Sequence, residues 1–382
     1  MKTKILLALL LLIITGVVVF FALLQFQPAI NVAPVAPAYD KYDYGRADEA
    51  KIIDIGTQPN TVNSTFLTEY LFRDRILRQQ LAAEGWKLRE HRYRSGNDML
   101  PYTDGRLDVV ILGDIPAFIS MLQYNMGIYA VTAQSENAVI TNGRVAPSDL
   151  KGMRIGYPPK TSAHFTLERA LRSAGLSIND IVSVPLKPAE AEPSLKSNSV
   201  DAVAIWPPFI TAILENVPGS TIVSSSNTCN YFGIDLGFAE RHPYLMKAVL
   251  AAVVRQVRWS RLDEANLYTG LLQVRQAQIR FSGKSVVDAN EKWISWLRKV
   301  STDNASFPML PLDFSDEQGL QHQQFDFLKK IGILPPDAEW KSLLSHVKLR
   351  DLPEIINAGK TWQIDRFDYA PDKLYQDKEV SP

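Results

Sequence analysis

The chain has 382 residues, of which 46% are hydrophobic and 21% are charged, as in a globular protein large enough for two core-forming units. Its 41 basic and 41 acidic residues cancel, so no bulk charge favours nucleic acid or an acidic partner. The single cysteine, Cys229, excludes an internal disulfide framework and a cysteine-rich metal site, and we expect it to be buried and inert.

The chain begins with a long apolar segment. Lys2 and Lys4 precede the uncharged run 5–26, which exceeds the ~7–15 residues of a signal-peptide core and matches the ~20 residues that span a bilayer. We therefore interpret residues 1–27 as a transmembrane anchor or an uncleaved signal. The positive charges before the run favour a cytoplasmic N-terminus, with the rest of the chain at the outer face of the cytoplasmic membrane.

A proline-containing stretch follows the apolar run. Residues 28–46 predict an extended linker, because prolines stand among small residues there. Ala36-Pro37-Ala38 resembles a cleavage site but lies well beyond the apolar run, and a cleaved signal remains the alternative.

The first globular stretch alternates strands with helices. Residues 52–55 predict a strand that ends at Gly56-Thr57-Gln58-Pro59, and residues 65–84 predict a helix. Further strands are expected at 86–93 and 107–112, with a short helix opening at Ser95-Gly96-Asn97 and Gly113-Asp114 following the last strand.

The stretch 151–209 repeats this order. Residues 153–157 alternate apolar with polar or small residues, as in a half-buried strand. The next segment predicts a helix that Thr161 or Ser162 caps at its start and Gly175 at its end. A strand at 181–186, a helix at 189–197 and a strand at 201–205 follow. Strands and helices in this order require right-handed crossovers and a parallel sheet.

Ligands bind outside the carboxyl ends of parallel strands, where helix N-termini present free N–H groups. The ends of these strands carry residues 158–164 and Trp206-Pro207-Pro208. A capped helix start beside an aromatic side chain suits a small ligand with an anionic end and an organic body.

Two motifs in this stretch resemble a known family. The run S-A-H-F-x-L-x-R-A-L-x-x-A-G-L-x-x-x-D-I, followed by V-D-A-V-A-I-W-P-P-F, is similar to the second lobe of the nitrate/sulfonate/taurine (NitT/TauT) periplasmic solute-binding proteins of ABC importers. In the first half, G-T-Q-P, R-S-G and G-D-I-P-A resemble the first-lobe loops of that family. Relatives commonly have Gly-Ser before the helix, where this chain has Lys160-Thr161.

The resemblance implies an α/β type II periplasmic-binding-protein fold, with two lobes, a hinge and a ligand cleft, behind the N-terminal transmembrane helix. Lobe 1 is expected to be discontinuous, from residues 47–138 and 232–382, and lobe 2 to be residues 139–231. The chain is expected to cross between the lobes near 135–141 and 227–232.

The resemblance also implies a function. It is that of an extracytoplasmic solute-binding component, which binds a small organic anion such as an alkanesulfonate or taurine and presents it to a separate permease and ATPase. A membrane-tethered ligand sensor or accessory protein on the same fold remains open, as does a binding protein for nitrate, bicarbonate or a thiamine-pyrimidine precursor.

Catalysis is not expected. The chain lacks the H-E-x-x-H and G-x-S-x-G motifs, and its five histidines have no metal-ligand spacing. We therefore expect no enzyme activity, no cofactor and no metal.

Eight residues are candidates for ligand binding because they combine short polar side chains or open backbone amides with one aromatic ring. They are Gln58, Ser95, Gly96, Asp114, Ser135, Ser162, His164 and Trp206. For Asp114 the alternative is that it fixes its own loop by accepting backbone N–H bonds, and for His164 that it helps to cap the helix.

The C-terminal part predicts helices. They are expected at 242–279, 286–300, 315–332 and 338–347, with Pro308 and Pro311 between the second and third and Pro335-Pro336 between the third and fourth. The polar tail after Trp362 is expected to be loosely held.

Overall fold

The computed structural model describes residues 51–302, 314, 316–348 and 350–373, all within one unit of the chain, Pro37–Pro382. The predicted anchor 1–27 and linker 28–46 lie outside the described residues. Among the residues described, no helix is long and apolar enough to cross a membrane.

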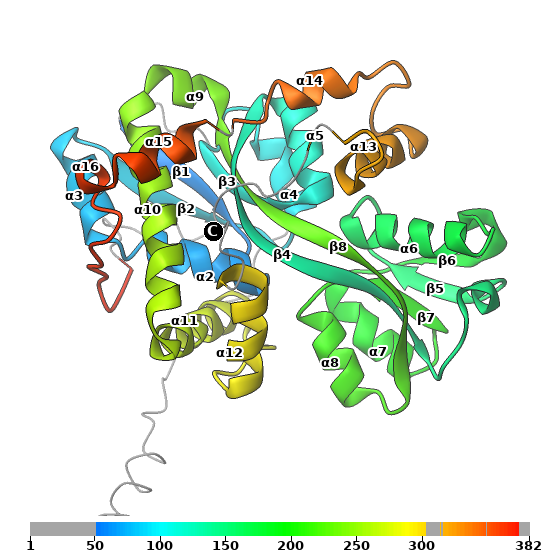
Figure 1. Ribbon diagram of the computed structural model, residues 1–382. Coiled ribbons are helices and arrows are strands. Elements are labelled where there is room, and N and C mark those ends of the chain that lie inside the picture. The colour runs from blue at the N-terminus through cyan, green and yellow to red at the C-terminus, as the bar shows by residue number, and fades with distance from the viewer. Residues whose placement is uncertain (1–50, 303–313, 315, 349, 374–382) are drawn as a thin grey trace, which may run out of the picture. The chain divides into compact units, whose positions relative to one another are not determined.

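Eight strands form one mixed sheet in the order β2-β1-β3-β8-β4-β7-β5-β6 (Figure 1). The strands are β1 (Ile52–Thr57), β2 (Lys87–Arg92), β3 (Val109–Gly113), β4 (Met126–Asn142), β5 (Arg154–Tyr157), β6 (Val182–Pro185), β7 (Ala202–Ile205) and β8 (Ser220–Asp235). Strand β1 is parallel to β2 and β3, and β5 is parallel to β6 and β7. The expected parallel arrangement is therefore confirmed within each set of three, whereas β4 and β8 run antiparallel to their neighbours.

The long strands β4 and β8 join the two halves of the sheet. They have 17 and 16 residues and pair with each other over most of their length. Strand β8 pairs with β3 through residues 230–234, and β4 pairs with β7 through residues 138–141. Between these regions, residues 134–137 and 226–229 pair only with each other, so a two-stranded ribbon connects the halves (Figure 1).

The first half carries the helices α2 (Val62–Leu71), α3 (Arg75–Ala83), α4 (Gly96–Met99), α5 (Asp114–Tyr124), α9 (Leu236–Arg241) and α10 (Pro243–Leu262). The single helix expected at 65–84 is two helices instead. Asp74 starts the second one, because its Oδ1 accepts a hydrogen bond from the N–H of Leu77 at 2.9 Å. Its Oδ2 lies 2.8 Å from Nε of the fully buried Arg255 in α10. This ion pair fixes the junction between α2 and α3 to the protein core.

The second half carries α6 (Ser162–Ser173), α7 (Ala191–Lys196) and α8 (Phe209–Asn216). The Thr161 hydroxyl accepts from the N–H of His164 and caps α6, as expected. Gly175 follows the helix with φ +71°, a left-handed conformation that glycine adopts without strain. Short 3-10 segments lie at Leu100–Tyr102, Pro147–Leu150, Ile178–Asp180 and Pro188–Glu190.

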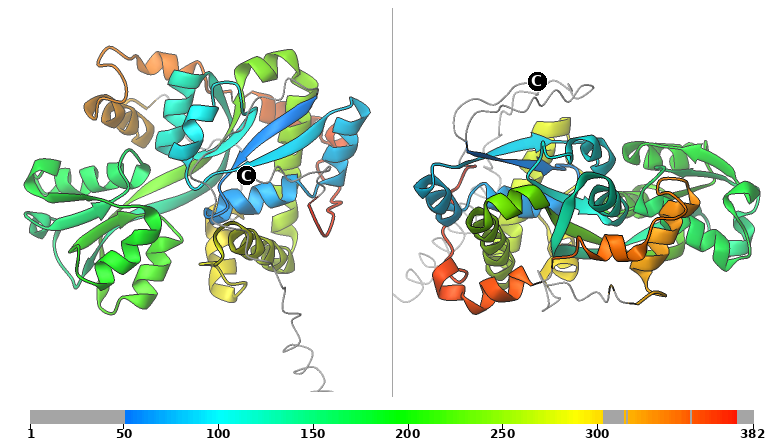
Figure 2. Two further views of the ribbon diagram at one scale, coloured as in Figure 1. Left: turned by 180° about the vertical axis from the view of Figure 1, so that it is seen from behind. Right: turned by 90° about the horizontal axis from the view of Figure 1, so that it is seen from above.

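The remaining helices are α11 (Glu264–Ser282), α12 (Glu291–Leu297), α13 (Leu320–Lys330), α14 (Trp340–Leu344), α15 (Asp351–Asn357) and α16 (Gly359–Trp362), with a π-helical turn at Arg298–Thr302. Helix α13 lies between α5 and α6 (Figures 1 and 2). On its first-half side, Gln324 bonds to Asp114 of α5, and on its second-half side Lys330 pairs with Glu168 of α6.

The described tail after Trp362 is held firmly, so the expectation of a loose tail is wrong for this part. The Lys373 side chain is 5% exposed, and its Nζ lies 2.6 Å from Glu69 and 3.0 Å from Glu90, whose side chains are 1% and 5% exposed. Tyr369 packs edge-on against Tyr70, with ring centroids 5.0 Å apart. These partners lie far away in the sequence, and for this reason the polar composition of the tail was misleading.

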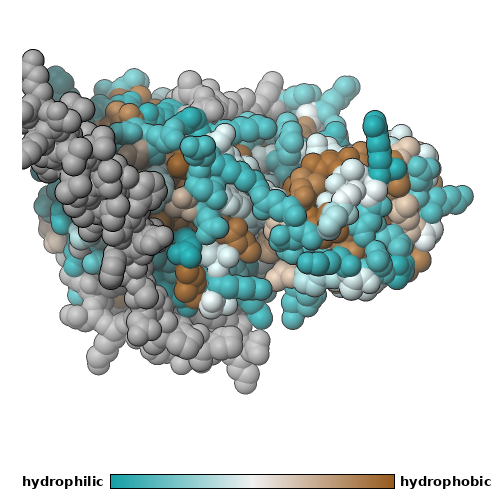
Figure 3. All heavy atoms as spheres, turned by 90° about the horizontal axis from the view of Figure 1, so that it is seen from below, coloured by the Kyte–Doolittle hydropathy of each residue, from teal (hydrophilic) through white to brown (hydrophobic). Residues whose placement is uncertain are grey.

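Apolar side chains also reach the surface of the second half. Leu214 of α8 is 42% exposed and Ile222 of β8 is 49% exposed. Seen from below, hydrophobic atoms gather on the part of the molecule that carries α7 and α8 (Figure 3). Exposed apolar side chains are common on the surfaces of globular proteins.

Candidate functional site

A cavity of about 330 Å³ lies between the two halves, beside the connecting ribbon. The first half contributes Gln58, Asn60, Thr61, Asn63, Arg94, Ser95, Gly96, Asn97, Asp98, Gly113, Pro116 and Trp296. The strands β4 and β8 contribute Ser135, Asn137, Thr228 and Asn230, and the second half contributes Thr161, Ser162, Lys187, Pro188, Ala189, Trp206, Pro207 and Phe209.

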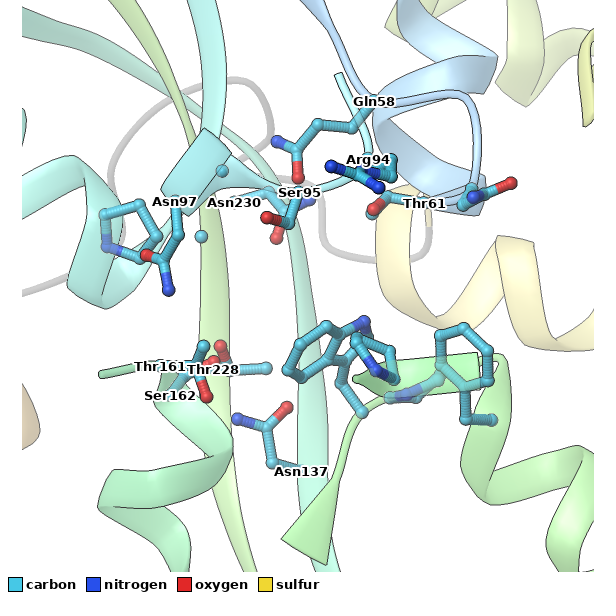
Figure 4. A pocket seen from close by; sticks show the side chains of 18 of the residues that line it. Gln58, Thr61, Arg94, Ser95, Asn97, Asn137, Thr161, Ser162, Thr228 and Asn230 are labelled. Carbon is cyan, nitrogen blue, oxygen red and sulfur yellow. The ribbon is translucent and has the colours of Figure 1, made fainter. Parts of the chain in front are cut away.

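One wall of the cavity is the ribbon itself. Ser135 and Asn137 are two residues apart on β4, and Thr228 and Asn230 are two residues apart on β8. Because side chains alternate between the faces of a strand, each pair projects to one side. All four line the cavity, and Figure 4 shows Asn137, Thr228 and Asn230 around it.

Several helices begin at the cavity. The N-cap residues Thr61 of α2, Ser95 of α4 and Thr161 of α6 all line it, and α8 begins there at Phe209. Each helix follows the carboxyl end of a strand. Strands β1–β3 run opposite to β5–β7 in the sheet, so the carboxyl ends of the two sets, and the helix starts that follow them, face each other across the cavity. The first N–H groups of a helix lack partners within the helix and carry the positive end of its dipole, so these helix starts attract anions.

The charged side chains that line the cavity also favour a negatively charged ligand. Arg94 and Lys187 are cationic, and Asp98 is the acidic side chain among the lining residues described. Nε of Arg94 lies 3.7 Å from Oδ2 of Asp98, and both side chains are partly exposed. The lining therefore carries one more positive than negative charge.

Aromatic and proline side chains supply an apolar wall. Trp206 and Phe209 meet edge to face with ring centroids 6.4 Å apart, and Trp296 of α12 lines the cavity from the first half. Pro116, Pro188 and Pro207 add further apolar surface. An organic group can be desolvated against this wall while a charged group faces the helix starts.

The halves touch each other around the cavity. Nδ2 of Asn97 in α4 donates to the carbonyl oxygen of Pro159 at 3.4 Å, in the loop before α6. Lys292 of α12 pairs with Glu215 of α8. Each contact joins an element of the first half to one of the second half, as expected of two halves closed over a cavity.

Six of the eight residues predicted from the sequence line this cavity. They are Gln58, Ser95, Gly96, Ser135, Ser162 and Trp206. Packing favours glycine at position 96, because a Cβ there would lie 3.1 Å from the side chains of Leu112 and Pro116.

Asp114 lies outside the cavity lining. It is 1% exposed, and its Oδ1 accepts from the N–H of Cys229 at 2.8 Å while its Oδ2 accepts from Nε2 of Gln324 at 2.7 Å. Burial raises the pKa of its carboxyl to about 6, although these hydrogen bonds oppose the shift. These contacts fit the alternative role considered for Asp114, in which its carboxylate accepts a backbone N–H bond. The N–H group belongs to Cys229 of β8, however, and not to the loop of Asp114 itself.

His164 is in the first turn of α6 and also lies outside the cavity lining. Its ring stacks on Tyr157 with centroids 4.7 Å apart and meets Phe327 of α13 edge-on at 5.0 Å. Burial lowers the pKa of its imidazole to about 4, so the ring is neutral at pH 7. Its Nδ1 accepts from the N–H of Lys160 at 3.3 Å, which steadies the loop before the helix.

Cys229 is buried, as expected, and desolvation raises the pKa of its thiol well above the ordinary value. Within the described residues, no group of His, Cys, Asp and Glu side chains is placed to hold a metal ion.

Asn137 is the main residue that the sequence reasoning missed. It is fully buried, and neither Nδ2 nor Oδ1 has a hydrogen-bond partner in the described part of the chain. An unpaired buried polar group costs about 1–3 kcal/mol, so such residues require an explanation. The two-residue spacing of Ser135 and Asn137 in a predicted crossing segment was the signal that could have revealed it.

Comparisons with known proteins agree with this geometry. Residues 123–269 match the NMT1-like family. An aliphatic sulfonates-binding protein of Escherichia coli is 33% identical over 117 residues, which are 29% of this chain and 36% of that protein. The matched segments span about a third of the length of the curated relatives.

Solved structures extend the likeness to most of the chain. The periplasmic aliphatic sulphonate binding protein SsuA from Escherichia coli aligns with a TM-score of 0.59 at 19% identity, covering 80% of this chain and 97% of that one. The chain therefore has the α/β periplasmic-binding-protein fold with a mixed sheet. The desulfurization enzyme DszB also aligns, with a TM-score of 0.53 at 16% identity over 81% of this chain and 99% of that one, so enzymes occur on similar folds.

Proposed function

We propose that this chain, which shares the fold of periplasmic sulfonate-binding proteins and resembles them in sequence over its middle part, is an extracytoplasmic solute-binding protein of an ABC importer. The observation that carries the proposal is the convergence of helix starts from both halves on one cavity with an aromatic wall. Such a cavity suits a small organic anion, and an alkanesulfonate-like compound is our leading candidate.

The anionic end of the ligand would bind near Ser95, Gly96 and Ser162, where hydroxyl groups and the first N–H groups of α4 and α6 are available. Trp206 would cover the organic part. Arg94 and Lys187 would offset the ligand's charge without a buried salt bridge, because both reach solvent.

The mechanism we propose is closure of two lobes about the ribbon of β4 and β8. Lobe 1 would comprise residues 47–138 and 232–382, and lobe 2 residues 139–231. A few backbone torsions in the two strands would open and close the cleft. The closed form would be recognised by a separate permease and ATPase, which supply the transport energy.

We further propose that residues 5–26 hold the protein at the outer face of the cytoplasmic membrane. The support for this step is the length and apolarity of the segment and the lysines that precede it. Release of the protein into the soluble fraction of intact cells, with Ala38 or a nearby residue as its N-terminus, would favour the cleaved-signal alternative.

A ligand screen by thermal unfolding tests the function. The full chain in detergent would be melted with alkanesulfonates, taurine, nitrate, bicarbonate and thiamine-pyrimidine compounds. A ligand at 100 times its Kd stabilises the folded state by about 2.7 kcal/mol, which raises Tm visibly. We expect a saturable rise with an organic anion.

Variants of cavity residues test whether the ligand that raises Tm binds in the cavity. The rise should be lost in Trp206→Ala and in Ser162→Ala and kept in Tyr268→Ala, which removes a partly exposed ring on α11 away from the lining. A well-folded chain that responds to no compound would contradict the importer function and favour the sensor or accessory alternative.

A further inference from the structure

Gln58 presents its amide oxygen to the cavity. Its Nε2 donates to the backbone carbonyl of Ile111 at 2.6 Å. Because a carbonyl oxygen can only accept, this bond fixes the orientation of the Gln58 amide: one N–H of Nε2 is used, and Oε1 is the acceptor that the residue offers. Gln58 is 7% exposed, and within the described residues its Oε1 has no hydrogen-bond partner.

Asn230 is oriented in the same way. Its Nδ2 donates to Oδ1 of Asn63 at 3.1 Å and to Oγ of Ser64 at 3.0 Å. The N–H of Ser64 already donates to Oδ1 of Asn63, which fixes that atom as an acceptor and therefore fixes Asn230 as the donor. The Oδ1 of Asn230 is left without a partner among the residues described.

These two residues lie on the same side of the cavity. Gln58 comes from the loop between β1 and α2, and Asn230 comes from β8. Figure 4 shows both near Ser95, across the cavity from Ser162. Two amide oxygens thus face a space that the ligand must fill, and neither can donate to an oxyanion.

An organic anion without a hydrogen-bond donor does not match this side of the site. When such a ligand displaces water, both amide oxygens lose their hydrogen bonds and gain none. A site built around hydrogen bonds discriminates strongly against an analogue that cannot make them. A ligand with an N–H group would satisfy both oxygens.

We infer that the ligand carries an N–H donor group, such as an ammonium, amine or amide, which Gln58 and Asn230 bind through Oε1 and Oδ1. Its anionic end is then bound across the cavity, at the start of α6 beside Ser162. The inference rests on the proposed function and narrows the ligand from organic anions in general to those that also bear an N–H group.

Calorimetric titration of the full chain with three matched sulfonates tests this inference. Taurine carries N–H groups, N,N,N-trimethyltaurine keeps the positive charge but has no N–H, and ethanesulfonate has neither. We expect taurine to bind at least ~10-fold more tightly than both others, since each lost hydrogen bond is worth about a factor of ten. Equal affinity for ethanesulfonate or the trimethyl compound would overturn the inference and leave the proposed function intact.

Two variants test whether Gln58 and Asn230 are responsible for the preference for taurine over ethanesulfonate. Gln58→Met and Asn230→Ala should each weaken taurine binding by about 10-fold and leave ethanesulfonate binding unchanged. Ser162→Ala, at the anionic end, should weaken both ligands equally. If one acceptor variant does not fold, the other still decides the question. If a folded Gln58 or Asn230 variant loses affinity for taurine and ethanesulfonate to the same extent, the assignment is contradicted. If the parent protein binds no sulfonate at all, both the proposed function and this inference are contradicted.

Discussion

Lys330 of α13 lies 2.5 Å from Glu168 of α6, measured from Nζ to Oε2, and this ion pair links helices attached to different halves of the sheet. Lys330 is half exposed, whereas Glu168 is 3% exposed. The same helix holds the first half through Gln324 and Asp114. Helix α13 therefore fastens the two halves together beside the connecting ribbon, and any opening of the cleft has to accommodate it.

We predict that Lys330→Met lowers the free energy of unfolding by about 1–2 kcal/mol, because it leaves a buried carboxylate without its cation. Urea denaturation measures the change. The double variant Lys330→Met/Glu168→Gln should lose less than the sum of the single losses. Lys341→Met, at an exposed position of α14, is the control, and an equal loss there would show that the ion pair contributes nothing specific.

Asp114 and His164 should give the protein opposite dependences on pH. The unfolded Asp114 ionises above pH ~4 but the folded residue keeps its proton until about pH 6, so its contribution to stability falls as the pH rises through this interval. The unfolded His164 is protonated below pH ~6.5 but the folded residue only below about pH 4, so its contribution falls as the pH is lowered. Each effect is on the order of 3 kcal/mol, and they largely cancel.

Single substitutions should expose the two effects. Asp114→Asn still accepts from Cys229, and a flip of the Gln324 amide, whose Oε1 has no partner in the described part, would accept from the new NH₂ group. This variant should be more stable than the parent at pH 7 and lose stability as the pH is lowered from 6 to 4. His164→Phe should do the reverse and gain stability on acidification. Melting temperatures between pH 4 and 8 measure both, and parallel profiles for the three proteins would contradict the assigned shifts.

Asn137→Val should stabilise the ligand-free protein by about 1–3 kcal/mol, because it removes two buried polar groups that have no partners in the described structure. Valine also suits a strand. Since such groups are retained where function needs them, we expect the same variant to bind ligand more weakly. Thermal unfolding without ligand measures the first effect. A loss of stability would show that ordered water satisfies the asparagine.

Lys373→Met should destabilise the protein by about 1–3 kcal/mol, since Glu69 and Glu90 lose a shared cation but keep Arg73 and Arg92 as partners. Limited proteolysis should then cut the segment after Trp362 more rapidly. Asp372→Asn changes the exposed neighbouring residue and should have little effect. A Lys373 variant as stable as the parent would mean that the tail is not fastened through this residue.

The sequence predicted the second half of the sheet best. Its strands and helices follow local signals, such as the cap at Thr161 and the glycine at 175, that depend on no distant partner. The division of the helix at Asp74 could not be read in this way, because it depends on Arg255, 181 residues away. The same holds for Lys373, whose partners lie about 300 residues earlier.

The site was predicted where residues stand in loops at the ends of parallel strands, as Ser95, Ser162 and Trp206 do. Asn137 and Asn230 were missed because their direction depends on the pairing of β4 with β8, which the sequence does not specify. His164 and Asp114 lie outside the cavity lining, and this could not be read from the sequence, because α13, which contacts both residues, comes some 160–210 residues later in the chain.

The most direct test of a ligand cavity between the halves is a titration followed by tryptophan fluorescence. Trp206 and Trp296 line the cavity from opposite halves, so a bound organic anion should change their emission saturably, with one ligand per chain. We predict that the change is lost in the double variant Trp206→Phe/Trp296→Phe and kept in Trp86→Phe, which alters a tryptophan outside the lining. A saturable change that persists in the double variant would place the ligand elsewhere and contradict the account.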